Sequence, residues 1–299
     1  MTNPRAEIEF FYTPENPVSP EALNVTMSGS EFSRYITSSD KSIIERVWKD
    51  KVLVANPKAT AGPLATLSSS RDGVLICDAS NFQDYVATTR TSLNPDFDKE
   101  LRALPLEERR LQPDFYSRMR ILAVGAYLET GDGTILVHRR PSNATHAPNL
   151  IDSSCAGLCK IYDGGVIKPQ TDLEEKMFRE LGLKPSDATL LGVTNVHSSE
   201  APDFSGMISF GLKTHLAPEE LKPGINPKTA SGYFFVPKRQ LVDFIIDKYT
   251  GTREMVGDGA AVLMGALDRD QFNYTVRQIK ESGKRVEFGN LESGFLVKN

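Results

Sequence analysis

The chain lacks the features of secreted, membrane-embedded and broadly basic proteins. Three cysteines in 299 residues are too few, and odd in number, for a disulfide framework of the secreted type. No segment approaches the roughly 18 consecutive apolar residues of a membrane helix, and the first residues lack the basic-then-apolar order of a signal peptide. The formal net charge of −4 argues against a broad nucleic-acid face, which needs clustered Lys and Arg. We therefore expect a cytoplasmic protein with neither membrane nor nucleic-acid partners.

The composition is that of a globular protein with a packed core. Apolar residues make up 39% of the chain and charged residues 25%, and the length suits one large domain or two modest ones. A charged, proline-punctuated stretch from 93 to 113 reads as a linker. We therefore expect an N-terminal α/β region over residues 1–110 and a second domain over residues 111–299 that ends in helices.

Local patterns predict the elements of both parts. In the first part we expect a helix from residue 39 to 49, strands at 51–55 and 73–77, and a helix from residue 80. In the second part apolar strands alternate with helical segments, and Gly131-Asp132-Gly133 offers a hairpin turn. The strands are expected at 119–128, 135–138, 190–196, 207–212 and 232–236, and the helices at 237–248 and 258–267. This order predicts an α/β protein with a mixed sheet and helices on its faces.

The segment from 119 to 193 has the order strand, loop, strand, loop, helix. The helix closes on Glu180-Leu181-Gly182-Leu183. On this order and this helix exit, the chain resembles the Nudix family over residues 119–240. The resemblance implies an α/β/α sandwich in which helix carboxylates hold magnesium or manganese while the substrate's diphosphate is cleaved. It therefore implies a hydrolase, a pyrophosphatase in the broad sense, with a small-molecule substrate.

The family's carboxylate run is altered in this chain. With the end of the run placed on Gly182-Leu183, its Arg-Glu falls on Glu175-Lys176 and its Glu-Glu on Arg179-Glu180. Only Glu180 keeps the family's residue type. Lys176 and Arg179 share a helix face with Glu180 and would repel a divalent cation. Two interpretations stay open: a solvated face of i,i+4 ion pairs, or a shifted metal site that uses Asp163, Glu174, Glu175 or Glu180.

Cys155 and His197 suggest a second chemistry on the same fold. In the related isopentenyl diphosphate isomerases a cysteine lies two residues before a histidine, and here Cys155 precedes Gly157 by the same step. The resemblance makes Cys155 an acid–base candidate, whereas a buried cysteine would serve as a small apolar side chain. His197 with Glu200 is a second candidate pair, because acid–base catalysis needs a group that titrates near neutrality beside a carboxylate.

Three basic side chains are candidates for substrate binding. Arg139 and Arg140 directly follow the second strand of the 119–193 segment, and a guanidinium can bind a phosphate with two hydrogen bonds. His146 lies in the next loop, where family members close over the substrate. The alternatives are surface charge for the arginines and a solvated loop histidine.

Three functions follow. The first is a Nudix hydrolase of a nucleoside diphosphate derivative or a prenyl diphosphate, with a rearranged carboxylate site and magnesium or manganese. The second is an isomerase or other acid–base enzyme that has lost metal-dependent hydrolysis and needs no metal. The third is a non-catalytic ligand-binding or scaffold protein, whose first hundred residues supply a partner surface or the contact of a homodimer.

Overall fold

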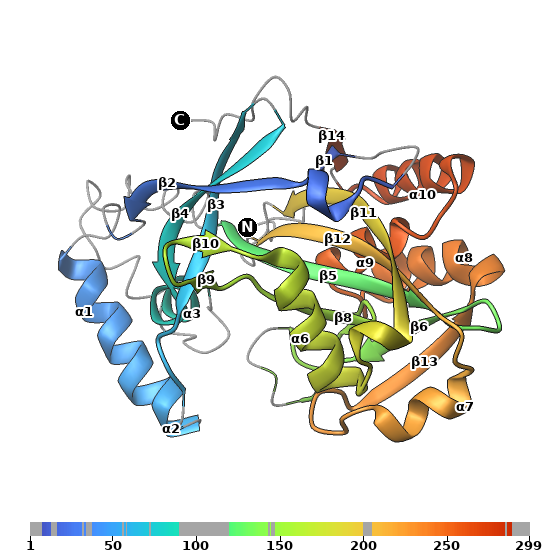
Figure 1. Cartoon of the computed structure of the whole chain (residues 1–299), viewed down its shortest axis with the longest axis horizontal. Helices are drawn as coiled ribbons and strands as arrows, with labels where there is room; N and C mark the ends of the chain where they lie inside the picture. Colours follow the sequence, from blue (N-terminus) through green and yellow to red (C-terminus); the bar gives the residue numbers. More distant parts are fainter. Residues whose placement is uncertain are drawn as a thin grey trace.

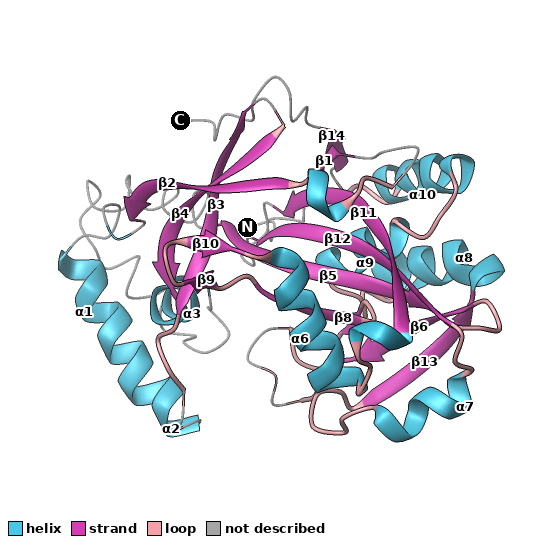
Figure 2. Ribbon diagram, viewed as in Figure 1, coloured by secondary structure: helices cyan, strands magenta, loops and turns pink. Residues whose placement is uncertain are grey.

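The structure is a computed structural model that describes most of the chain. The described residues are 8–12, 17–31, 33, 38–55, 57, 59–71, 73–89, 120–142, 144, 147–199, 205–284 and 286–288. Their strands form a 12-stranded mixed sheet and a separate two-stranded one, with helices on both faces of the large sheet (Figures 1 and 2). The predicted α/β class with a mixed sheet is confirmed. In the described part of the chain, no helix has the length and apolar character needed to cross a membrane.

The centre of the large sheet is β5 (Arg120–Glu129). One edge of β5 runs parallel to β12 (Ser205–Thr214), which is antiparallel to β11 (Ala188–Ser199). Its other edge pairs in turn with β3, β8 and β6. The predicted hairpin from β5 to β6 (Thr134–Arg139) is present, and Thr130 N donates to Thr134 O at 2.9 Å within its turn.

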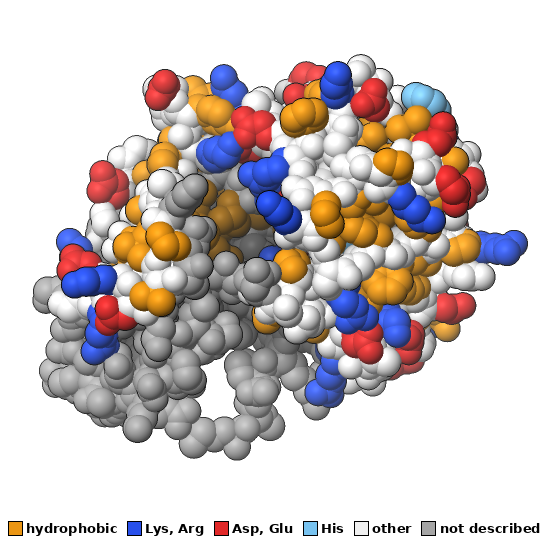
Figure 3. Space-filling view, turned by 90° about the horizontal axis from the view of Figure 1, so that it is seen from below, with side chains coloured by type: hydrophobic (Ala, Val, Ile, Leu, Met, Phe, Trp, Pro, Cys, Tyr) orange, Lys and Arg blue, Asp and Glu red, His pale blue; other side chains and the backbone are white. Residues whose placement is uncertain are grey.

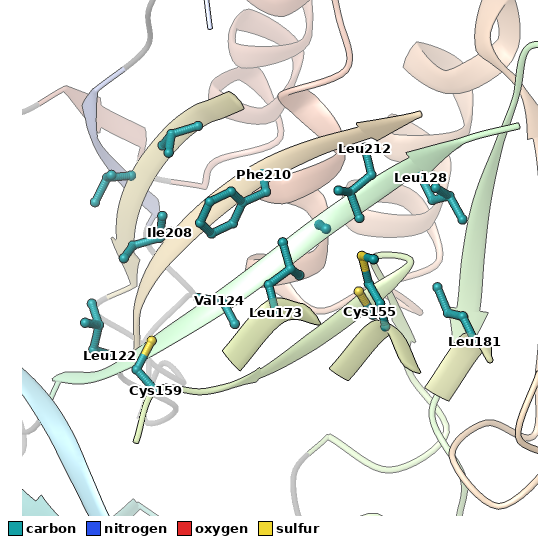
Figure 4. Close-up of a cluster of buried hydrophobic side chains, with 14 of the residues drawn as sticks. Leu122, Val124, Leu128, Cys155, Cys159, Leu173, Leu181, Ile208, Phe210 and Leu212 are labelled. Atoms are coloured by element: carbon teal, nitrogen blue, oxygen red, sulfur yellow. The ribbon is translucent and has the colours of Figure 1, made fainter. Parts of the chain in front are cut away.

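Alternate residues of β5 contact helices on opposite faces of the sheet, as the period of a strand requires. Val124, Ala126 and Leu128 belong to the core beneath α6 (Pro169–Leu181), part of which is drawn in Figure 4. Tyr127 belongs to the core beneath α9 (Gly257–Met264). The sheet is therefore the middle layer of three.

Helix α6 is amphipathic and ends on a glycine. It buries Leu173, Met177 and Leu181 against the sheet, spaced four residues apart as one face of a helix requires. Gly182 follows with a φ of +69°, the left-handed conformation that favours glycine at a helix end. The end of α6 at Gly182, on which the family resemblance partly depends, is therefore explained by the left-handed conformation of this glycine.

The remaining elements surround this centre. Strand β13 (Gly232–Pro237) pairs with β6 and extends the sheet. The other elements after β6 are β7 (Ile151–Asp152), β8 (Cys155–Leu158), β9 (Ile161–Tyr162), β10 (Val166–Ile167), α7 (Pro218–Leu221), α8 (Leu241–Ile245), α10 (Arg269–Glu281) and β14 (Val286–Phe288). The helices predicted at 237–248 and 258–267 correspond to α8 with its flanking turns and to α9.

Strands from before residue 90 belong to the same large sheet. β1 (Ile8–Tyr12) lies between β11 and β14, and β3 (Pro63–Arg71) pairs with the start of β5. β4 (Val74–Asn81) and β2 (Asn24–Glu31) continue the sheet beyond β3. Helix α1 (Ser38–Val47) and helix α3 (Phe82–Thr89) belong to this part. The boundary predicted at residue 110 lies outside the described residues.

The strand predicted at 51–55 is wrong. The chain there is helical, with a π-helical turn at Trp48–Val52 and a short helix α2 at Leu53–Ala55 that continue α1. Ile44 and Val52 are buried whereas Val54 is 74% exposed. Ile44, Trp48 and Val52 recur every four residues, so the helical period decides the structure and the short apolar run of 52–54 misled the prediction.

Candidate functional site

A cavity of about 300 Å³ lies between α3, α6 and the sheet. Its polar lining comes from the end of β6, from β7, from α6 and from the first turn of α9, and its apolar lining from α3 and the central strands. The lining includes Phe82, Tyr85, His138, Arg140, Asp152, Gly157, Leu158, Lys176, Glu180, Met207, Val256 and Asp258. Figure 3 shows a hollow on the face seen from below, with apolar side chains inside it and Lys or Arg side chains beside it.

Lys176 and Glu180 form an ion pair at the cavity wall. Lys176 Nζ donates to Glu180 Oε1 at 3.0 Å across one turn of α6, and the two side chains are 22% and 14% exposed. Arg179 Nη2 lies 3.9 Å from the same oxygen, but the Arg179 side chain is 56% exposed and is not among the lining residues. The α6 face that meets the cavity therefore carries one cation and one carboxylate.

Gly157 of β8 makes room for the Lys176 side chain. A Cβ at position 157 would lie 2.0 Å from Lys176 Cε and 2.9 Å from its Cγ, far inside van der Waals contact. The lysine stem therefore lies directly over the strand, and the missing side chain at position 157 determines where the ammonium group is held.

A second ion pair joins Arg140 to Asp152. Arg140 Nη1 donates to Asp152 Oδ2 at 2.7 Å, and Ser153 N donates to Asp152 Oδ1 at 2.8 Å. Burial of Asp152 favours the neutral acid, but the charges of Arg140 and His138 and these hydrogen bonds outweigh it and hold the pKa of Asp152 below its usual value. Asp152 is therefore an ionised carboxylate that fixes the Arg140 guanidinium.

His138 has a defined hydrogen bond at the same wall. Its Nδ1 lies 2.5 Å from Ser153 O, and because a carbonyl oxygen can only accept, Nδ1 must carry the proton. In the neutral ring Nε2 is then the unprotonated nitrogen. The ring lies beside Tyr233, with centroids 6.5 Å apart.

The carboxylates proposed for a shifted metal site are not brought together. Asp163 lies exposed in the turn between β9 and β10, Glu174 Oε1 accepts from Gln170 Nε2 at 3.1 Å, and Glu175 pairs with Lys160. Glu180 lines the cavity, with Lys176 at its side. Among the described residues, no group of three or more His, Cys, Asp or Glu side chains is arranged to hold a metal ion. The α6 residues therefore do not fit magnesium or manganese.

Cys155 lies in the apolar core beneath α6. Its side chain is fully buried among residues that include Leu173 and Leu181 (Figure 4). Burial, more than any neighbouring charge, raises the pKa of the Cys155 thiol far above its usual value, so the group stays protonated at neutral pH. Cys155 is not among the cavity-lining residues. These surroundings suit the small apolar role.

The structure separates the two arginines proposed for substrate binding. Arg140 lines the cavity, whereas Arg139 Nη2 bonds Glu254 Oε2 at 3.0 Å and its Nη1 donates to Asn149 O at 2.8 Å. In β11 the backbone of His197 lies opposite Phe10 of β1 and Met207 of β12. The His197 side chain, Glu200 and His146 lie outside the described residues, so their predicted roles stay predictions.

Several lining residues are not among the site residues that the sequence predicts, and they include His138, Asp152, Phe82 and Tyr85. His138 and Arg140 stand two apart, and the period of a strand alone would have placed them on one face. Asp152 belongs to a strand of two residues, too short for any pattern. Phe82 and Tyr85 reach the cavity only through pairing of distant strands, for which the sequence gives no local signal.

The comparisons with known proteins give a likeness to solved structures. No protein-family model matches the chain, and no curated protein matches it. A MutT protein from Methanosarcina mazei is 14% identical, with a TM-score of 0.31 over 54% of this chain and 96% of that chain. The Ap4A hydrolase of C. elegans is 10% identical, with a TM-score of 0.32 over 55% of this chain and 98% of that chain.

A third solved structure, Tm1382, bears the name of the family that the sequence resembles. It is assigned to the Nudix hydrolases and is 14% identical, with a TM-score of 0.34 over 73% of this chain and 96% of that chain. At such TM-scores these likenesses carry no argument about the cavity. What the cavity can bind is therefore argued from the side chains that line it in this chain.

Proposed function

We propose that the protein is a Nudix-fold enzyme that binds a diphosphate-containing small molecule in the α6 cavity, with Lys176 and Arg140 neutralising the phosphates in place of a metal on α6. The observation that carries the proposal is the Lys176–Glu180 ion pair at the cavity wall. It places an ammonium group on the helix face to which the resemblance assigns a bound cation.

Both cations can change partners when the ligand arrives. Lys and Arg form charge-assisted hydrogen bonds with phosphate oxygens as well as with carboxylates, and in the ligand-free cavity Glu180 and Asp152 hold the two cations in place. Asp258 adds a third acidic side chain to the lining. A ligand phosphate therefore competes with a carboxylate at each cation, which predicts selective rather than very tight binding.

The exchange of partners gives Glu180 a chemical role. A nearby cation favours the ionised form of a carboxylate and weakens it as a base. When a phosphate oxygen takes the Lys176 ammonium, the Glu180 carboxylate loses that stabilisation and becomes a stronger proton acceptor. We assign Glu180 as the general base toward a water molecule or toward the substrate, with Lys176 and Arg140 holding the phosphates.

Binding of inorganic pyrophosphate, followed by calorimetry in EDTA and in magnesium, tests the first part. The wild type should bind in EDTA, and Lys176→Met should weaken binding by about 10- to 150-fold, the equivalent of one charged hydrogen bond of about 1.5–3 kcal/mol. Lys160→Met is the matched control, because Lys160 pairs with Glu175 and does not line the cavity. Binding that requires magnesium and ignores Lys176→Met would overturn the proposal.

Turnover tests the second part. The purified protein is incubated with ADP-ribose, dinucleotides and prenyl diphosphates, each with and without magnesium. We expect product in EDTA for one class, and we expect Glu180→Gln to abolish it while pyrophosphate still binds. Turnover that needs magnesium and survives Glu180→Gln would instead favour a metal site elsewhere in the chain.

A further inference from the structure

Two aromatic side chains from the N-terminal part line the same cavity. Phe82 and Tyr85 belong to α3, and Lys176 and Glu180 belong to α6, two helices that stand apart in Figure 1. Residues from both parts of the chain therefore build one cavity, with one ion pair on α6, a second between Arg140 after β6 and Asp152 of β7, and aromatic rings on α3.

The position of the rings follows from the sheet. β3 pairs with the start of β5, and β4 pairs with β3. Helix α3 begins directly after β4. Asn81 fixes this start, because its Oδ1 accepts from Asp84 N at 2.8 Å, as a capping side chain does. Phe82 is thus the first helical residue after β4. The position of β4 is fixed by its pairing with β3 and, through β3, with the central strand β5.

The Phe82 ring is held in place by its neighbours. Trp48 packs edge-on against it, with centroids 6.1 Å apart and planes at 86°, and Tyr85 lies 6.2 Å away at 43°. Phe82 is partly exposed, whereas Tyr85 is 6% exposed. A braced, partly exposed ring offers a flat surface on which another flat ring gains stacking energy, whereas a flexible chain gains only from burial of its apolar surface and loses rotational freedom there.

We infer that Phe82 is a specificity-determining residue that stacks on a planar ring of the ligand, while Lys176 and Arg140 hold the phosphates. The inference rests on the proposed function for the phosphate end alone. A volume of about 300 Å³ is at the lower end of the range of about 300–1,000 Å³ for small-molecule pockets. The cavity therefore has room for one ring system with its phosphates.

Three probes separate the two ends of the ligand: inorganic pyrophosphate, ADP and geranyl diphosphate, each titrated in EDTA. We expect ADP to bind the wild type at least about fivefold more tightly than pyrophosphate, since stacking of one base is worth about 1–3 kcal/mol. Geranyl diphosphate should gain much less. Phe82→Leu keeps an apolar side chain without the flat ring, and should remove the advantage of ADP while leaving pyrophosphate binding unchanged.

Phe82→Tyr, which keeps the ring, should retain the advantage, and Phe178→Leu is the control on an exposed phenylalanine of α6. Pyrophosphate binding by each variant reports that the cavity is intact. Equal affinity of ADP and pyrophosphate in the wild type, an equal gain for geranyl diphosphate, or a Phe82→Leu variant that keeps the ADP advantage would overturn the inference and leave the proposed function standing. Failure of all three probes to bind would overturn both.

Discussion

Lys176 Nζ lies 3.0 Å from Glu180 Oε1, one helical turn away on the face of α6 that lines the cavity. At position 176 the sequence resemblance aligns a carboxylate. The positive charge there both pairs with the one retained glutamate and opposes a divalent cation beside it. Substitutions at this pair and in its surroundings therefore test how much of the cavity's chemistry depends on it.

Lys176→Glu should create a cation site on α6. The variant would place two carboxylates one turn apart at the cavity wall, and oxygen ligands of this kind suit magnesium and manganese. We expect manganese binding, measured by calorimetry or by electron paramagnetic resonance, in Lys176→Glu and not in the wild type. Lys184→Glu makes the same charge change on an exposed residue after the helix. Equal manganese binding by both variants would show that position 176 has no special geometry.

Gly157→Ala should displace Lys176. Because a Cβ at position 157 would lie 2.0 Å from Lys176 Cε, the lysine stem must leave its place over β8, and since the stem is flexible and partly exposed this shift costs little stability. Pyrophosphate affinity, measured by calorimetry, should fall while the free energy of unfolding changes little. Gly232→Ala is the matched strand control, since nothing lies within 4 Å of a Cβ there. Unchanged affinity in Gly157→Ala would mean that Lys176 does not need its present position.

Asp152 should make stability depend on acidity. Its pKa in the folded protein is below the value of about 3.9 for an unfolded aspartate. The native state therefore binds fewer protons at this group than the unfolded state does, and its contribution is present above about pH 4 and is lost as pH falls through the folded pKa. Urea unfolding should give a flatter dependence on pH for Asp152→Asn between about pH 5 and pH 2.

At neutral pH the same Asp152→Asn variant should be less stable by about 1–3 kcal/mol, because a charged hydrogen bond to Arg140 is lost. Asp163→Asn, on an exposed turn, should follow the wild type at every pH. If Asp152→Asn loses stability at low pH as the wild type does, other carboxylates determine how the free energy of unfolding falls with pH.

The three thiols should be inert in the native protein. Cys77, Cys155 and Cys159 are buried, and burial raises the pKa of Cys77 to about 12, so the reactive thiolate is scarce. Ellman's reagent at pH 8 should label none of them before unfolding in urea and all three afterwards. Cys155→Ala should retain ligand binding and turnover. Rapid labelling of Cys155, or loss of turnover in Cys155→Ala, would restore its acid–base role.

Local sequence patterns predicted the elements around the cavity well. The β5–β6 hairpin, the strands β11 to β13 and the exit of α6 at Gly182 all follow from alternation, turn residues and capping, which act over a few neighbouring residues. The prediction of a strand at 51–55 is wrong because a run of three apolar residues fits the period of a strand as well as that of a helix. Burial of Ile44 and Val52 on one face favours the helix that the structure shows.

Which residues line the cavity could be predicted less well from the sequence. Consecutive strand residues face opposite ways, so Arg139 and Arg140 could not both belong to one site, and His138 at the same phase as Arg140 was the available hint. Phe82 lies far from α6 along the chain and reaches the cavity through the pairing of β3 with β5. Such long-range pairing leaves no signature in the neighbouring residues.

The pairing of the early strands with β5 and β11 also bears on how the chain can be shortened. A fragment beginning at Arg120 would leave the start of β5 and the outer edge of β11 without the partners that β3 and β1 provide. Backbone N–H and C=O groups along such edges are a template for strands of other molecules. The isolated second half would therefore be prone to aggregate, and the first ninety residues protect it from doing so.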